Sequence, residues 1–141
     1  MTAVYVESSA LLTWLLGEPR AHEVSTALDK AQTVVTSVLS LVEVERALNR
    51  AEVQRILTAG QAERLRGMLV RSTAGWILME ISEEVRARAG RVFPVEPVRT
   101  LDAIHLATVL MSMRAFPDLR LLSYDERILA NARPLGIDTA A

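Results

Sequence analysis

The sequence predicts an α/β fold in which a small parallel β-sheet is flanked by helices on both faces. Short apolar or β-branched segments, which are typical of buried strands, alternate with longer segments whose apolar residues follow helical spacing. The chain has 141 residues, the usual size of one domain, and half of its residues are hydrophobic. No repeat or linker divides it. We therefore expect a single three-layer α/β/α domain spanning residues 1–141.

The first half of the chain contains two predicted strands. The apolar segment before Glu7 and the β-branched segment that ends at Ser37 both favour short buried strands. Leucines at helical spacing follow Glu7, and Ser37 can cap the helix after it. In order, we expect a strand at 3–6, a helix ending at the Gly-Glu-Pro of 17–19, a helix over 20–30, a strand at 33–37 and a helix over about 38–58.

The second half predicts two further strands and a short edge strand. Its helix at 101–113 is apolar on nearly every face, so we expect it to be buried. The Ser-Tyr-Asp-Glu sequence at 123–126 matches a capping box with Ser123 as the cap. In order, we expect a helix over 62–72 after a break at Gly60, a strand at 75–81, a helix opened by Ser82, a loop at 93–97, a helix over 101–113, a strand at 120–124, a helix to about 132 and an edge strand at 136–139. Because helices supply the crossovers that parallel strands need, the sheet should be parallel.

The composition excludes several classes of protein. Cysteine is absent, which excludes disulfides and thiolate metal sites. No apolar run approaches the ~20 residues that cross a bilayer, and the N-terminus lacks the basic region of a signal peptide. We therefore expect a cytoplasmic protein without membrane contact. The net charge is −1, so any nucleic-acid binding has to come from local basic patches.

Acidic residues mark the predicted ends of strands and the starts of helices. Glu7 ends the first strand, Asp125 follows the fourth strand, and Asp102 lies in the first turn of the buried helix. Glu43 and Glu45 lie early in the helix that follows the second strand. Because these positions share one edge of a parallel sheet, several carboxylates should converge there. Such carboxylates repel one another, and Mg²⁺ or Mn²⁺ would relieve the repulsion.

Each acid also has a simpler explanation. Asp102 and Asp125 can stabilise helix N-termini by ~0.3–1 kcal/mol, and Glu43 can form a capping box or pair with Arg46. Glu7 is harder to explain in this way, because it interrupts an apolar segment and no capping role is evident for it. The pattern formed by all four acids together is therefore stronger than any one of them.

Four segments resemble the successive motifs of a known family. "VYVESSALL", "TSVLSLVEVERAL", "RTLDAIHLAT" and "LLSYDERILANARPLGI" are similar to motifs of PIN-domain ribonucleases, particularly the VapC-type toxins of toxin–antitoxin pairs. The resemblance runs from about residue 4 to residue 138. It implies a small parallel sheet wrapped by helices and Mg²⁺- or Mn²⁺-dependent hydrolysis of RNA.

The resemblance also implies which residues form the site. The four acids of the family fall on Glu7, Glu43, Asp102 and Asp125, which would be both the metal ligands and the catalytic residues. The small hydroxyl residues after the first acid fall on Ser8 and Ser9, which would support the metal ligands by hydrogen bonding. The implied chemistry is metal activation of a water molecule for in-line attack on an RNA phosphodiester. The implied partners are RNA, a small antitoxin that covers the site, and a second copy of the chain in a homodimer.

The chain departs from the family pattern at Glu7, where the family normally has aspartate. The extra methylene moves the carboxylate, and Mg²⁺ tolerates little geometric error. The alternative interpretation is therefore a PIN-like binding module whose catalytic activity is weakened or lost. A helical projection adds a second ambiguity, because it places Glu45 within an apolar arc and Glu43 at the edge of that arc. Only one of the two can face the site, and the family pattern selects Glu43.

Other chemically active residues carry weaker signals. His105 lies in an apolar helix, which favours a buried, hydrogen-bonded core residue over a general base or a zinc ligand. Trp14 and Trp76 lie in apolar runs and are expected in the core rather than as platforms for base stacking.

Three arginines are close in sequence to the predicted acids. Arg46, Arg99 and Arg127 can bind phosphates or be solvated surface residues. No glycine-rich nucleotide-binding motif and no Gly-x-Ser-x-Gly motif occurs in the chain.

Overall fold

The computed structural model describes residues 2–140, and over this range the predicted α/β fold is confirmed. One sheet has the strand order β3-β2-β1-β4-β5, and each neighbouring pair is parallel. The strands are β1 (Ala3–Val6), β2 (Thr33–Ser37), β3 (Ile77–Met79), β4 (Arg120–Leu122) and β5 (Asp138–Thr139). Met1 and Ala141, the ends of the predicted domain, lie outside the described residues.

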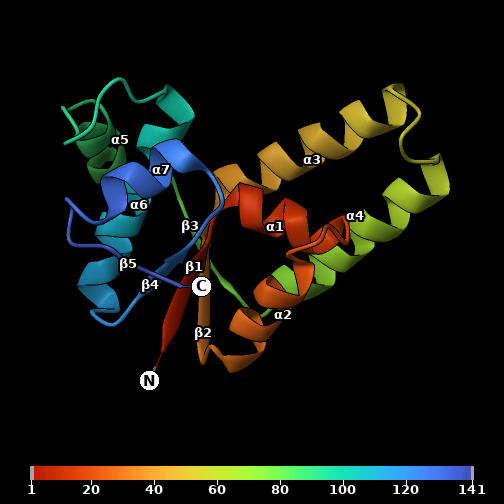
Figure 1. The fold of residues 1–141 in the computed structure, drawn as a ribbon, viewed down its shortest axis with the longest axis horizontal. Helices are drawn as coiled ribbons and strands as arrows, with labels where there is room; N and C mark the ends of the chain where they lie inside the picture. Colours follow the sequence, from red (N-terminus) through yellow and green to blue (C-terminus); the bar gives the residue numbers. More distant parts are fainter. Residues whose placement is uncertain (1, 141) are drawn as a thin grey trace.

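Helices cover both faces of this sheet, which gives the expected three layers (Figure 1). The helices are α1 (Ser8–Leu15), α2 (Ala21–Lys30), α3 (Val38–Val53), α4 (Ala59–Thr73), α5 (Glu83–Ala89), α6 (Thr100–Ala115) and α7 (Glu126–Ala132). Helices α1 to α4 lie on one face and α5 to α7 on the other, and α3 and α4 project from the body as a hairpin. None of the helices within residues 2–140 is both long enough and apolar enough to span a membrane.

The central strand β1 supplies both halves of the core, because successive side chains point to opposite faces of the sheet. Ala3 and Tyr5 pack into the cluster below α6 and α7. Val4 and Val6 pack into the cluster below α1, α3 and α4. All four residues are buried. The strand therefore ends in the middle of the molecule, and this brings Glu7 to a central position at the carboxyl edge of the sheet. Trp14 and Trp76 are partly buried against the second cluster, as expected.

Two predicted helix boundaries are wrong for identifiable reasons. Helix α4 begins at Ala59, so Gly60 lies inside its first turn and does not break a helix. Thr58 determines this start, because Thr58 and Gln61 form a reciprocal capping box with bonds of 3.1 and 2.9 Å. The preceding helix α3 ends at Val53, and Arg55 in the connection has a φ of 59°.

The predicted cap of the last helix is also wrong. Asp125 caps α7 by accepting hydrogen bonds from the backbone N–H groups of Arg127 and Ile128, at 2.9 and 3.3 Å. Ser123 is not the cap of α7. Its hydroxyl donates to the Glu7 carboxylate and accepts a hydrogen bond of 3.1 Å from the backbone N–H of Asp125, which lies before the first residue of the helix. The matched capping-box pattern therefore identified the start of a helix but not the residue that caps it.

Candidate functional site

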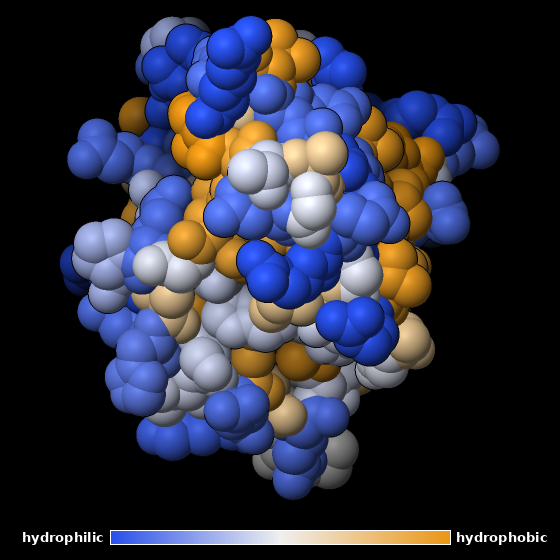
Figure 2. Space-filling view, turned by 90° about the vertical axis from the view of Figure 1, so that its right-hand side faces the viewer, coloured by the Kyte–Doolittle hydropathy of each residue, from blue (hydrophilic) through white to orange (hydrophobic). Residues whose placement is uncertain are grey.

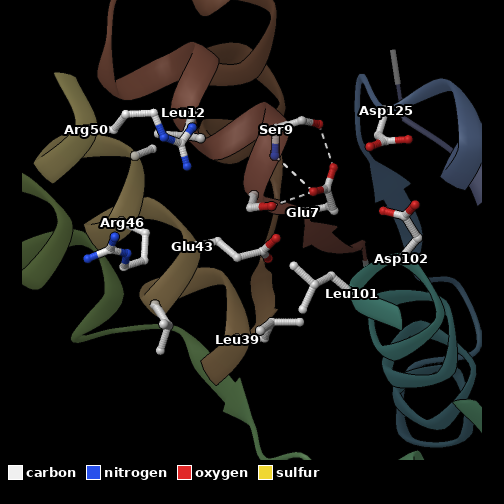
Figure 3. A pocket seen from close by; sticks show the side chains of 13 residues that line it. Glu7, Ser9, Leu12, Leu39, Glu43, Arg46, Arg50, Leu101, Asp102 and Asp125 are labelled. Atoms are coloured by element: carbon white, nitrogen blue, oxygen red, sulfur yellow. Dashed lines mark hydrogen bonds between the residues drawn. The ribbon is translucent and has the colours of Figure 1, made fainter. Parts of the chain in front are cut away.

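The candidate site lies where β1 and β4 end side by side. Val6 pairs with Leu122 in parallel register, so the residues that follow them, Glu7 and Ser123, meet at one edge of the sheet. A pocket of about 500 Å³ opens there between α1, α3, α6 and α7 (Figure 3). It is lined by Glu7, Ser8, Ser9, Leu12, Leu39, Val42, Glu43, Arg46, Ala47, Arg50, Leu101, Asp102 and Asp125. The four predicted acids thus share one pocket, although they are as far as 118 residues apart in sequence.

Glu7 is the most constrained of the four acids. Its side chain is 3% exposed and accepts four hydrogen bonds. The hydroxyls of Ser8, Ser9 and Ser123 donate to it at 2.6, 2.5 and 2.6 Å, and the Ser9 backbone N–H donates at 3.0 Å. The last bond makes Glu7 the N-cap of α1, which corrects the expectation that it has no capping role.

His105 and the serine hydrogen bonds together decide the charge of Glu7. Burial by itself raises the pKa of this carboxyl, but nearby His105 and the hydrogen bonds from Ser123, Ser8 and Ser9 outweigh burial. The pKa of Glu7 is therefore held below its ordinary value, and the group is a carboxylate at neutral pH. Ser8 and Ser9 contact this acid as expected. Ser123 is an additional member of the site that the sequence pattern assigned to another role.

Asp102 differs from Glu7 because one of its carboxylate oxygens has no hydrogen-bond partner within residues 2–140. It lies in the first turn of α6 and is 8% exposed, and its Oδ2 atom is buried without a hydrogen-bond partner among the described residues. Burial raises the pKa of Asp102, and the charges of Asp125 and Glu7 raise it further, against smaller opposing effects of Arg127 and His105. An unpaired buried oxygen close to other acids is the feature that a bound cation would satisfy.

Asp125 lies beside Asp102 at the mouth of the pocket (Figure 3). Its Oδ1 atom accepts the two hydrogen bonds that cap α7. The capping interpretation of Asp125 is therefore right. It does not exclude a role in the pocket, because no hydrogen bond within residues 2–140 involves the other carboxylate oxygen, Oδ2.

Glu43 reaches the pocket from α3 and is held there by a buried histidine. The Nε2 atom of His105 lies 2.5 Å from Glu43 Oε1, and the Nδ1 atom lies 2.8 Å from the hydroxyl of Tyr5. His105 is 1% exposed, so the expectation of a buried, hydrogen-bonded histidine is confirmed. Its contact with a predicted site acid could not be derived from the apolar pattern around it.

Glu45 lies outside the pocket. Its carboxylate accepts a hydrogen bond of 3.0 Å from Arg66 of α4, which also contacts Glu52 and Asn49. Glu45 therefore joins α3 to α4. The helical projection is misleading because the arc that it assigns to the core also faces α4. At that contact the salt bridge between Glu45 and Arg66 takes the place of apolar packing.

The basic residues of the pocket differ from those expected. Arg46 lines the pocket, as its position near the acids suggested, and Arg50 lines it as well. Arg99 and Arg127 are absent from the lining. Arg50 lies one helical turn after Arg46, and this spacing could have predicted that both arginines line the same pocket.

The donor set is suited to a hard divalent cation. The pocket offers carboxylate and hydroxyl oxygens, which Mg²⁺ and Mn²⁺ prefer, and the unpaired Asp102 oxygen lies among them. The side chains are not gathered into a coordination cage, because no three acidic or histidine groups within residues 2–140 converge closely enough to hold an ion. Glu7 is bound to the serines and Glu43 to His105, so the ligands would have to rearrange on binding.

Comparison with known families identifies the fold. The sequence model of the PIN-domain family matches residues 4–134. The chain belongs to the PIN-domain family. Among curated proteins, this PIN domain is 36% identical to ribonuclease VapC46 of Mycobacterium tuberculosis, over 100% of the chain and 98% of the relative. It is 32% identical to ribonuclease VapC47 of the same species, over 98% of the chain and 96% of the relative.

Solved structures share the PIN fold at lower identity. A toxin–antitoxin complex from Klebsiella pneumoniae superposes with a TM-score of 0.68 at 16% identity and covers 98% of both chains. VapC20 of Mycobacterium tuberculosis, a toxin that cleaves the sarcin–ricin loop, superposes with a TM-score of 0.62 at 17% identity, over 90% of this chain and 93% of that one. The first structure covers the PIN domain almost from end to end.

Proposed function

We propose that this PIN domain is a divalent-metal-dependent endoribonuclease and the toxin of a type II toxin–antitoxin pair. The observation that carries the proposal is the single pocket in which Glu7, Glu43, Asp102 and Asp125 meet. The relatives named ribonuclease VapC match over nearly the whole chain and support the same function.

Three of the four acids share one part in the proposed reaction. Asp102, Glu7 and Glu43 would hold a Mg²⁺ or Mn²⁺ ion, with Asp125 helping to hold it or a second ion. When bound, such an ion supplies an activated water and neutralises charge on the phosphoryl oxygens. His105 and the three serine hydroxyls keep Glu7 ionised, the serines also orient it, and His105 orients Glu43. Asp102 has to lose its proton before it can bind a cation, and its raised pKa makes this step sensitive to acid.

Three further features belong to this proposal. A small antitoxin is the proposed protein partner, and the toxin–antitoxin complex among the solved neighbours supports it. A homodimer and a cytoplasmic location stay predictions. Sedimentation of the purified chain with and without a co-expressed antitoxin tests the first two of these features.

Cleavage of total RNA with mapping of the cut ends tests the proposed activity. The wild-type chain should cut at defined positions in Mn²⁺ and should stop when the ion is chelated. Glu7→Asp should be measured beside it, because it restores the acid that is usual in the family. Faster cutting by Glu7→Asp would mean that glutamate slows the enzyme, whereas no cutting by either protein would reject the proposed activity.

One observation favours a second candidate function, a binding module that no longer cuts RNA. The Glu7 carboxylate is fully engaged by serine hydroxyls and a backbone amide, and this leaves it poorly available to a metal ion. Thermal melting with and without millimolar Mn²⁺ discriminates the two functions. A ligand that binds only the folded state raises the free energy of unfolding by RT ln(1 + [L]/Kd), so an enzyme should melt at a higher temperature in Mn²⁺ and a pure binding module should not.

A further inference from the structure

Two arginines on α3 join the acidic pocket to a second hollow. Arg46 and Arg50 line the pocket of the four acids, and they also line a hollow of about 420 Å³ further along α3. They are the only residues common to both linings, and the remaining residues of the second hollow extend to Gln54, just beyond the end of α3. The two hollows therefore adjoin at these two arginines.

The two guanidinium groups are spaced as a pair, and no salt bridge among the described residues holds either of them. Arg46 and Arg50 are four residues apart on one helix, so they lie on the same face about 6 Å apart along its axis. Both are exposed, and within residues 2–140 neither forms a salt bridge. Arg66 of the adjacent α4 shows the contrast, since it is tied to Glu45 and Glu52. Two free arginines on one face thus form a site for anions.

The pocket consequently has an acidic end and a basic end. In Figure 3, Asp102 and Asp125 lie on one side of the pocket, while Arg46 and Arg50 lie on the opposite side along α3. Leu12, Leu39, Val42 and Leu101 contribute apolar surface to the same lining. A polyanion can be bound at the basic end without a metal ion, whereas the acidic end repels it until a cation is present.

We propose that Arg46 and Arg50 bind backbone phosphates of a single-stranded RNA segment that enters the acidic pocket along α3. The inference rests on the proposed nuclease function and assigns the path of its substrate. Guanidinium groups bind phosphates through two parallel hydrogen bonds, and the apolar surface of the lining suits ribose and base faces that an unpaired strand exposes. Figure 2 shows the side of the molecule from which the α3–α4 hairpin projects, where hydrophilic side chains separate the apolar patches.

Salt-dependent binding tests the path. A short labelled single-stranded RNA is titrated with protein at several salt concentrations. The protein carries Asp102→Asn, which the proposed function predicts to slow cutting strongly. Arg46→Ala and Arg50→Ala should each weaken binding about three- to tenfold at low salt and reduce the slope of log K against log salt by about 0.7, the value for one phosphate of a single strand. Arg46→Lys and Arg50→Lys should keep the slope, because they keep the charge.

Arg64→Ala is the matched control, because Arg64 is an exposed arginine of α4 that lines neither hollow. It should leave both the affinity and the slope unchanged, and circular dichroism should show that all variants are folded. The path is wrong if the Arg46→Ala/Arg50→Ala double variant binds RNA like its parent. The same conclusion holds if the double variant loses binding of a protein partner but keeps binding of RNA. Equal binding of a duplex of the same sequence would also overturn it. A different result would reject the nuclease function itself. In that case Asp102→Asn, with Arg46 and Arg50 unchanged, would cut RNA as fast as the wild type.

Discussion

His105 joins Glu43 to Tyr5 through the two nitrogens of one buried ring, with distances of 2.5 Å to the carboxylate and 2.8 Å to the tyrosine hydroxyl. A carboxylate only accepts hydrogen bonds, so Nε2 carries the hydrogen. When the ring is neutral, Nδ1 is the acceptor and the Tyr5 hydroxyl donates to it. The tyrosine on β1 then supports the tautomer that donates to Glu43. Burial keeps Tyr5 protonated, because burial and the charges of Glu7 and Glu43 raise its pKa well above the ordinary value.

Tyr5→Phe tests this connection, because it removes the hydroxyl and keeps the ring. The Nδ1 atom loses its donor, so the free energy of unfolding should fall by about 1–2 kcal/mol. Chemical denaturation measures the loss, and nitrogen chemical shifts of His105 report the tautomer. Tyr124→Phe is the control, because the Tyr124 hydroxyl contacts only the surface carboxylate of Glu23, at 3.2 Å. Equal behaviour of the two variants would contradict the account.

Glu7→Gln should destabilise the fold. The neutral amide replaces a carboxylate that accepts four hydrogen bonds, and bonds to charged groups contribute more than neutral ones, so we expect a loss of about 1–3 kcal/mol at pH 7. The pKa of Glu7 is lowered by folding, so its contribution is present above the pKa of the unfolded chain and is lost as the pH falls through the folded value. The difference between wild type and variant should therefore shrink in acid. A pH-independent difference would show that ionisation of Glu7 is not what stabilises the fold.

Asp102→Asn should have the opposite effect on stability. The pKa of Asp102 is raised by folding, so the native state binds the proton more tightly and loses stability as the pH rises from the unfolded pKa through the folded one. Without divalent metal at pH 7, the neutral asparagine should therefore raise the melting temperature. Mn²⁺ should raise the melting temperature of the wild type and leave that of the variant unchanged. A variant less stable than wild type in a chelator would contradict the assignment of Asp102 as an electrostatically strained acid.

Arg66→Ala should loosen the α3–α4 hairpin. Arg66 contacts Glu45, Glu52 and Asn49, so its removal leaves two acids of α3 without their partner. The melting temperature should fall, and the loss should become smaller at high salt because salt screens the ion pairs. Arg64→Ala on the same helix is the control and should have little effect. Hydrogen exchange should locate the change in the hairpin, and a uniform change over the whole sheet would argue against this local role.

The sequence predicts the layers of this fold better than it predicts the contacts of individual polar side chains. Alternation of apolar strands and amphipathic helices is a property of many residues at once, so the parallel sheet and its helices are recovered. Capping depends on one hydroxyl or carboxylate. Ser123 fits a capping pattern and yet bonds to Glu7, because β1 and β4 are neighbours, which the local sequence does not reveal.

The acids show the same difference between pattern and contact. Spacing along α3 cannot decide between Glu43 and Glu45, since the answer depends on whether His105 or Arg66 lies opposite. Resemblance to the family selects the residue that lines the pocket. The charge states of Glu7 and Asp102 also depend on neighbours that are distant in sequence. For this reason the pKa of Glu7 is lowered while the pKa of Asp102, in the same pocket, is raised.

RNA cleavage by purified wild-type protein and Asp102→Asn, compared in Mn²⁺ and in a chelator, shows whether the four acids form a metal-dependent nuclease site. We expect cutting by the wild type only in Mn²⁺. We also expect Asp102→Asn to cut at least about a hundredfold more slowly, because even the partners of metal ligands contribute tenfold to a hundredfold. Equal cutting by the two proteins, or cutting that persists in the chelator, would contradict a metal-dependent nuclease site at the four acids.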